Sequence, residues 1–229
     1  MRLPLLKAEN LGKRFGAVEA VREAAFEINP GAITAFLGEN GAGKTTVLKL
    51  VLGFLKPDSG GFSWAVRKVG YVPERPAFFP WLRGDQILLG TARAFGLSGS
   101  EADTEVDAIS RRIAFDPSLL GRKVQTYSPG NQKKFAYLQN LLVRPDLLII
   151  DEPFSALDPG SIKSARELFR ELKAGGKAIL LSSHLISELE KVCDEFIIIK
   201  AGRIVAQGNL SGQPDLETIF FHYSKTALS

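Results

Sequence analysis

The sequence has little cysteine and no long apolar run, and both absences narrow the class of protein. Cys193 is the only cysteine among 229 residues, so no disulfide can form within the chain, as is usual in a reducing compartment. It lies in a helical pattern and is expected to be a buried apolar residue. No run of about 18 apolar residues occurs, and the apolar patch over 3–6 is too short for the core of a signal peptide. A disulfide-stabilised scaffold and a membrane-spanning chain are therefore not expected.

Basic residues are not clustered in any one part of the sequence. The net charge is only +4, and the 29 basic residues are scattered, with pairs such as Lys133-Lys134 but no longer block. A dedicated nucleic-acid surface is therefore not expected. Hydrophobic residues make up 45% of the chain, which is enough for a core. The length fits one large α/β domain with an inserted lobe.

One glycine-rich stretch with a lysine has a clear chemical meaning. An apolar run over 33–37 predicts a buried strand before it, and a helical pattern over 47–52 follows it. Strand, glycine-rich turn and helix, in that order, are what a phosphate-binding loop requires. The stretch consists of Gly38, Glu39, Asn40, Gly41, Ala42, Gly43, Lys44, Thr45 and Thr46.

The residue types of this loop suit a nucleoside triphosphate. Gly38, Gly41 and Gly43 are expected to adopt positive φ and to let the backbone approach a ligand. The N–H groups of the turn then form an anion-binding nest at a helix N-terminus. Lys44 adds a positive charge beside the β- and γ-phosphates, and the Thr45 hydroxyl is placed to bind Mg²⁺. The loop alone does not say how the energy is used.

The N-terminal third reads as strands around this loop. Short strands are predicted over 5–9 and 26–28, and a strand pair over 62–66 and 69–72. The helix after the loop is predicted over 43–55. Phe15 lies in a polar loop between the first two strands. It either anchors that loop to the core or offers a platform for a base.

The composition changes at Pro73, where a proline-punctuated loop begins. Helical periodicity resumes over 84–95 and 100–114, and no parallel-strand signal interrupts 76–145. We interpret 76–145 as a helical subdomain inserted into an α/β core of 1–75 and 146–212, which also carries the β-subdomain. The tail over 213–229 is expected to dock as a short helix.

Two later stretches contain polar residues that could be functional or merely local. Ser128 and Pro129 predict a helix start at which the N–H groups of Gly130 and Asn131 remain at the positively polarised end, although an ordinary helix cap has the same sequence. A buried strand over 147–152 ends in Asp151-Glu152, where a parallel sheet binds ligands, or where a polar turn simply follows.

The remaining segments complete the pattern. A helix is predicted over 161–172 and a strand over 177–182, after which His184 either acts chemically or caps the helix over 185–192. Strands over 196–200 and 203–206, joined by Ala201-Gly202, predict a hairpin.

The order and spacing of these motifs, from about residue 5 to 222, resemble the nucleotide-binding subunit of ATP-binding cassette (ABC) transporters. Residues 38–46 match the first Walker motif, 147–152 the second and 155–158 the D-loop, while 127–132 replace the signature motif usually written LSGGQ. The resemblance implies a P-loop NTPase (RecA-like) core, a small antiparallel β-subdomain and an inserted α-helical subdomain.

The resemblance also implies roles for single residues. Lys44 and the loop amides hold the phosphates, and Thr45, with Asp151 through water, holds Mg²⁺. Glu152 orients or deprotonates the attacking water, and His184 contacts the γ-phosphate. These are the roles that phosphoryl transfer requires, since it depends on positioning and charge neutralisation.

Two cassettes sandwich two ATP molecules in this family. The resemblance therefore implies that Ser128, Gly130 and Asn131 close over the nucleotide of a second copy, with Asp158 in the D-loop nearby. It also implies that Phe15 stacks on the adenine, which favours the second of its two interpretations.

Three departures from the family pattern stand out. Pro129 replaces a glycine and deletes one amide donor, so a weakened signature contact is expected, and Asn131 replaces a glutamine. Glu74 stands where most members have a glutamine that reaches Mg²⁺ and the attacking water; members resembling the bacterial ABC-2-type exporters often have an acid there. The stretch over 61–69 is shorter than usual, which predicts a trimmed β-subdomain.

The function expected from the resemblance is an ATP-hydrolysing subunit that dimerises, as a homodimer or heterodimer, and powers a separate multi-spanning permease. It would lie in the cytoplasm, peripheral to the inner face of the membrane. Phe78, Phe79 and Trp81 are the expected anchors for the permease, unless they pack inside the lobe.

Two alternatives stay open. The first is a soluble ABC ATPase that acts on nucleic acid, ribosomes or cluster assembly. It is disfavoured because the chain has neither a long coiled coil nor a second cassette. The second is a catalytically weak ATP-binding partner in an asymmetric pair. Glu152 and His184 argue against it, while Pro129 favours it.

Overall fold

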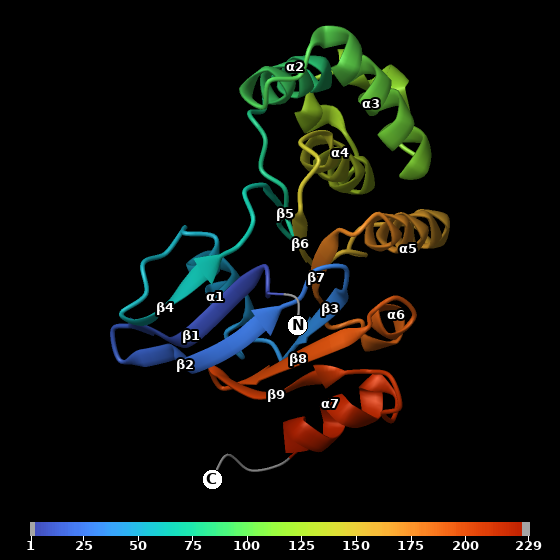
Figure 1. Ribbon diagram of the computed structural model, residues 1–229. Coiled ribbons are helices and arrows are strands. Elements are labelled where there is room, and N and C mark those ends of the chain that lie inside the picture. Colours follow the sequence, from blue (N-terminus) through green and yellow to red (C-terminus); the bar gives the residue numbers. More distant parts are fainter. Residues whose placement is uncertain (1–2, 226–229) are drawn as a thin grey trace. The chain divides into compact units, whose positions relative to one another are not determined.

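The computed structural model describes residues 3–225, and contacts between residues divide the chain into two compact units. The first unit combines the N-terminal residues through Arg67 with the C-terminal residues from Leu172, and the second consists of Lys68–Glu171. Figure 1 labels their elements. The division with a helical subdomain over 76–145 stays a prediction.

The first unit contains two sheets. A three-stranded antiparallel sheet has the order β2 (Val18–Ile28), β1 (Leu6–Phe15), β4 (Ser59–Trp64). In the second sheet β3 (Ile33–Leu37) pairs in parallel with β7 (Ala178–Ser182) and β8 (Glu195–Lys200), and β9 (Arg203–Asn209) runs antiparallel to β8. All five residues of β3 are buried, which is what a central parallel strand requires.

Three helices complete the first unit. They are α1 (Lys44–Val51), α6 (Ile186–Glu190) and α7 (Leu216–Lys225). The expected tail helix is present over Leu216–Lys225, with Leu216 and Ile219 buried, while 226–229 of the predicted tail lie outside the described residues. The β8–β9 turn has Ala201 at φ 46 and Gly202 at φ 82, as a two-residue hairpin turn of this kind needs, so the predicted hairpin is confirmed.

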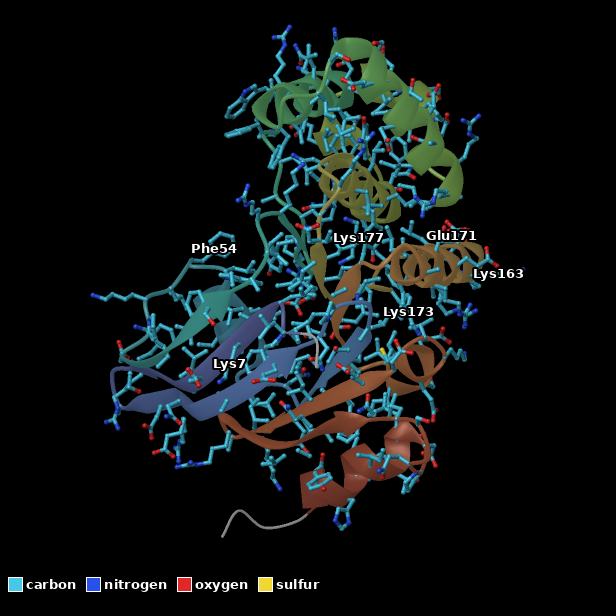
Figure 2. All side chains as sticks on the ribbon, viewed as in Figure 1. Lys7, Phe54, Lys163, Glu171, Lys173 and Lys177 are labelled. Carbon is cyan, nitrogen blue, oxygen red and sulfur yellow. The ribbon has the colours of Figure 1, made fainter. Side chains whose placement is uncertain are left out.

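A carboxylate and a lysine fix the start of β3. Asp194 Oδ2 accepts a hydrogen bond from the Ile33 N–H at 3.0 Å, and its Oδ1 pairs with Lys173 Nζ at 2.5 Å. Lys173 lies in the last turn of α5 (Pro159–Ala174) and is labelled in Figure 2.

The second unit combines two parallel strands with several helices. β5 (Val69–Val72) pairs with β6 (Leu147–Asp151). The helices are α2 (Gly84–Ala94), α3 (Gly99–Arg112), α4 (Pro129–Leu142) and most of α5. Short 3₁₀ turns, η1 (Pro117–Gly121) and η2 (Val124–Thr126), precede α4. Aromatic rings of Phe115, Tyr127 and Phe135 pack together at centroid distances of 5.7 to 6.1 Å.

One prediction about strands was wrong, and another gave strands that are too short. The segments over 62–66 and 69–72 do not pair with each other, because β4 pairs with β1, as Phe62 with Ala8, whereas β5 pairs with β6. The strands predicted over 5–9 and 26–28 are the far ends of a longer hairpin that closes at Gly16, whose φ is 57.

The helix after the glycine-rich loop is shorter than predicted. It ends at Val51, because Gly53 adopts φ 76 and the Phe54 N–H donates to the Lys49 carbonyl at 2.9 Å. This is a Schellman cap, which a left-handed glycine after the helix permits. Phe54 itself is 64% exposed and is labelled in Figure 2.

Cys193 is half-buried, and burial raises the pKa of its thiol. Within the described range of 3–225, no helix has the length and apolar character needed to cross a membrane.

Candidate functional site

The glycine-rich loop connects β3 to α1 in the first unit. Gly41 at φ 80 and Gly43 at φ 108 adopt the positive φ that was predicted. Gly38 does not, so that part of the prediction was wrong. A Cβ at Gly38 would lie 2.6 Å from the Ile199 carbonyl oxygen and 2.8 Å from Ile199 Cγ2. Glycine is therefore needed there because β8 packs against it.

Two other elements pack against the loop, namely β2 and the β8–β9 turn. A Cβ at Gly43 would lie 2.6 Å from the Ala20 carbonyl oxygen of β2. The Gly202 N–H, in the β8–β9 turn, donates to the Ala42 carbonyl at 2.9 Å. These contacts fix the backbone of the loop by packing within the first unit alone.

The start of α1 is suited to an anion. Its N-cap residue, Gly43, makes no side-chain cap, and the first turn contains no acidic residue, so the positive end of the helix is not neutralised locally. Lys44 Nζ donates to the Gly38 carbonyl at 2.6 Å and the Glu39 carbonyl at 3.2 Å. The ammonium is thus held against the loop. Thr45 and Thr46 follow in the first turn.

Phe15 and His184 also belong to the first unit. The Phe15 ring is 48% exposed, and Lys13 Nζ lies 5.7 Å from its centroid. This exposure argues against an anchor in the core. His184 is exposed and follows buried β7, and it is the Ser183 Oγ that accepts a hydrogen bond from the Leu185 N–H at 3.1 Å. The N-cap of α6 is Leu185 and has no side-chain cap, so a capping role of the His184 side chain is not seen.

The residues after β6 in the second unit have an unusual backbone. Asp151 is buried, with 6% of its surface exposed. Glu152 has φ 50 and Ala156 has φ 62. Non-glycine residues seldom adopt positive φ, and such strain concentrates at functional sites. The predicted second Walker motif and D-loop therefore form a turn that tertiary contacts must hold.

Helix α4 supplies those contacts. A Cβ at Gly130 would lie 2.8 Å from the Ala156 carbonyl oxygen. Further along, Lys133 Nζ donates to the Asp151 carbonyl at 2.9 Å, and Tyr137 Oη donates to the Pro153 carbonyl at 2.5 Å. The helix that begins at the signature stretch is therefore attached to the turn after β6.

The predicted cap of α4 is confirmed, and one detail needs correction. Ser128 is the N-cap and Pro129 follows at the first helical position. The Asn131 N–H does not remain available, because it donates to Ser128 Oγ at 3.3 Å. A serine N-cap reaches this third amide by its normal geometry, so only the Gly130 amide is left out of the cap.

Glu74 lines a cavity of about 370 Å³ in the second unit. The Glu74 side chain is 55% exposed, and its Oε1 lies 4.0 Å from Arg75 Nε. Lys133 is 1% exposed and reaches the Pro73 carbonyl at 3.1 Å. The lining residues are Glu74, Arg75, Pro76, Pro129, Gln132, Lys133, Ser155 and Ala156.

Two roles were missed in the sequence analysis. Asp158 caps α5, since its carboxylate accepts from the Ser161 N–H at 3.0 Å and the Ser161 hydroxyl at 2.5 Å, and these bonds hold its pKa below the usual range. An aspartate three residues before a serine at a helix start carried that signal. Lys133 shares a face with buried Tyr137 and Leu141 at helical spacing, which could have marked it as buried.

The predicted site residues are divided between the units. The first unit holds Phe15, the loop over 38–46 and His184, and the second holds Glu74, Ser128, Gly130, Asn131, Asp151, Glu152 and Asp158. Among residues 3–225, no cluster of three or more His, Cys, Asp or Glu side chains is arranged to hold a metal ion.

Comparison with known proteins gives matches to a single family. A family model described as ABC transporter matches residues 21–155. The chain is 35% identical to the ABC transporter ATP-binding protein YdbJ of Bacillus subtilis, over 93% of this chain and 71% of that protein. It is 33% identical to the Nod factor export ATP-binding protein I of Ralstonia nicotianae, over 90% and 67%.

A solved structure described as the ATP binding subunit of an ABC transporter superposes with a TM-score of 0.89 at 30% identity, covering 96% of this chain and 99% of that one. The family model spans more than half of the chain, and the phosphate-binding loop lies between β3 and α1 as a P-loop fold requires. The chain therefore belongs to the ABC transporter family and is an ATP-binding subunit of that family.

Proposed function

We propose that the chain binds ATP with Mg²⁺ and hydrolyses it to ADP and phosphate to drive transport by a separate membrane subunit. The observation that carries this proposal is the loop over 38–46, where Gly41 and Gly43 take positive φ directly before α1. The family membership supports it, since members generally hydrolyse ATP.

In this proposal the loop amides and Lys44 hold the β- and γ-phosphates. The positive end of α1 and the lysine charge both favour the triphosphate. Thr45 and Asp151 would hold Mg²⁺, with Glu74 as a further ligand. Few protein ligands suffice, because Mg²⁺ keeps several waters and binds the phosphates themselves. The ion would neutralise charge that develops on the phosphates.

Glu152 is proposed as the residue that orients or deprotonates the attacking water, and His184 as the contact to the γ-phosphate. Phe15 would stack on the adenine through its exposed ring. Ser128 and the Gly130 amide would close over the nucleotide of a second cassette. Because the Asn131 N–H is used by the cap, Gly130 would be the main amide donor in that contact.

A membrane partner is supported by two exposed aromatic rings. Phe79 and Trp81 are each 63% exposed, and their centroids lie 5.5 Å apart. Phe78 instead packs against Phe135 at 5.2 Å. Large exposed aromatic side chains favour interfaces. We therefore propose Phe79 and Trp81 as anchors for a multi-spanning permease, which would hold the chain at the inner face of the membrane.

The test compares ATP turnover of the purified chain with that of Glu152→Gln, at saturating ATP and Mg²⁺. We expect wild-type turnover and a loss of at least about 100-fold in the variant, which is the low end of what general base catalysis contributes. Equal and negligible rates in both proteins would refute hydrolysis.

A second experiment tests the transport partner. We expect the chain to co-purify with a membrane protein of several spans, and we expect Phe79→Ala/Trp81→Ala to abolish this co-purification.

A further inference from the structure

Lys133 is the most deeply buried charged side chain that the proposed reaction does not use. It is 1% exposed and lies among apolar residues on the inner face of α4. Its ammonium donates to two backbone carbonyls, those of Pro73 at 3.1 Å and Asp151 at 2.9 Å. Burial of a lysine is costly unless its donors are used, so this arrangement requires an explanation.

The two carbonyls have something in common. Each belongs to the residue directly before a predicted catalytic or metal-binding acid, since Pro73 precedes Glu74 and Asp151 precedes Glu152. One ammonium therefore fixes the peptide that leads into each of these two acids. We propose that Lys133 is a positioning residue, which holds the backbone of Glu74 and of Glu152 at a fixed separation through these two hydrogen bonds.

The electrostatic surroundings support this placement. Burial lowers the pKa of Lys133 to about 8, whereas the carboxylates of Asp151, Glu152 and Glu74 act in the opposite direction. The ammonium therefore lies within reach of the charges of all three acids. Its positive charge is attracted to these acids, an interaction that a neutral donor would not make.

The backbone at Glu152 needs such support. Its φ of 50 is strained for a residue with a side chain, so the turn keeps its shape only where other contacts hold it. Lys133 supplies one contact at the residue before Glu152, and it also links that turn to the segment of Glu74 across the cavity that both Glu74 and Lys133 line. Without it, the two peptides before Glu74 and Glu152 would lose the ammonium to which both of their carbonyls are bonded.

This inference rests on the proposed function, and the experiment separates the two. Lys133→Met keeps the length and apolar stem of the side chain and removes the donors. Lys133→Gln keeps two N–H groups on one nitrogen. Asn140→Leu is the matched control, because Asn140 Oδ1 accepts from the Tyr71 N–H at 2.9 Å and so links the same helix to β5 without bonding the peptide before either acid.

The first readout does not need activity. Hydrogen exchange of the nucleotide-free chain should rise at least about five-fold in peptides covering 73–76 and 150–156 in Lys133→Met, and stay unchanged there in Asn140→Leu. Unchanged exchange in both peptides would overturn the proposal, whether or not the chain hydrolyses ATP. Should Lys133→Met fail to fold, the same comparison is made with Lys133→Gln, with an expected rise of about two-fold.

The second readout compares the effect of each variant on kcat with its effect on ATP binding. Lys133→Met should lower kcat at least about ten-fold, while KM for ATP and binding of a fluorescent ATP analogue change less than two-fold, since the phosphate loop is in the other unit. Lys133→Gln should recover part of the lost kcat. Equal losses of kcat in Lys133→Met and Asn140→Leu would refute a positioning role. An inactive wild type would refute the proposed function, and the exchange data would still decide on Lys133.

Discussion

The three glycines of the phosphate-binding loop allow backbone strain and steric overlap to be measured separately. Gly41 has φ 80 and no atom within 4 Å of an added Cβ. Gly38 has an ordinary φ, but its Cβ would lie 2.6 Å from the Ile199 carbonyl oxygen. Gly43 combines φ 108 with 2.6 Å to the Ala20 carbonyl oxygen. Alanine at Gly41 therefore tests backbone strain, alanine at Gly38 tests steric overlap, and alanine at Gly43 tests both together.

The expected losses of unfolding free energy follow from these distances. A left-handed backbone destabilises the folded state by about 1–2 kcal/mol when the residue is alanine. Alanine also restricts the unfolded chain, which stabilises the folded state by about 0.4–1 kcal/mol. Gly41→Ala should therefore lose about 1 kcal/mol of unfolding free energy. Overlap with a backbone carbonyl forces a shift that costs about 1–3 kcal/mol, so Gly38→Ala should lose about 2 kcal/mol. Gly43→Ala should lose about 3–4 kcal/mol, close to the sum.

The assay is urea unfolding without nucleotide, followed by the fluorescence of Trp64. Trp64 Nε1 donates to the Val51 carbonyl at 3.1 Å, at the end of α1, so it reports on the unit that carries the loop. Trp81 is the second of the two tryptophans and is exposed, so all variants are made in a Trp81→Phe background. If Gly41→Ala is as unstable as Gly43→Ala, overlap with Ala20 contributes nothing and the reasoning fails.

Four further variants test the second unit. Burial raises the pKa of Tyr127 to about 12, whereas the unfolded chain keeps about 10, so the unfolded state loses its proton first. Between pH 10 and 12 the wild type should lose about 1–2 kcal/mol relative to Tyr127→Phe, allowing for solvent screening; urea titrations at pH 8 and 11 check this. Phe78→Ala should lose about 1–3 kcal/mol of unfolding free energy and exposed Phe79→Ala less than about 0.5 kcal/mol, by the same titration at pH 8. Ser98→Ala should lose about 1 kcal/mol, because Ser98 Oγ accepts from the Glu101 N–H; an unchanged midpoint would contradict that role.

Local patterns in the sequence predicted local structure well. The buried strand over 33–37, the serine cap of α4 and the turn at Ala201-Gly202 each depend on neighbours within a few residues, so periodicity and capping rules suffice. The partner of β4 could not be predicted in this way. Strand pairing depends on distant segments, and two adjacent apolar stretches suggest a hairpin that the structure does not contain.

The same limit applies to the candidate site. Gly38 and Gly41 look alike in the sequence, yet one is required by a contact with Ile199, 161 residues away, and the other by its own φ. The use of the Asn131 amide by Ser128 follows a known capping rule, and the sequence analysis could have found it. The helical spacing of Lys133, Tyr137 and Leu141 could have indicated that Lys133 is buried, but its two carbonyl partners come from distant segments and could not be predicted.

The turn after β6 shows how tertiary contacts determine what this site can do. Two non-glycine residues with positive φ, Glu152 and Ala156, would each cost about 1–3 kcal/mol if nothing held them. Gly130, Lys133 and Tyr137 hold the turn from successive turns of one helix. Because that helix starts at the signature stretch, a displacement of its N-terminus must also change the contacts around Glu152. Because the turn is strained, loss of any one of these contacts allows its backbone to relax to another conformation.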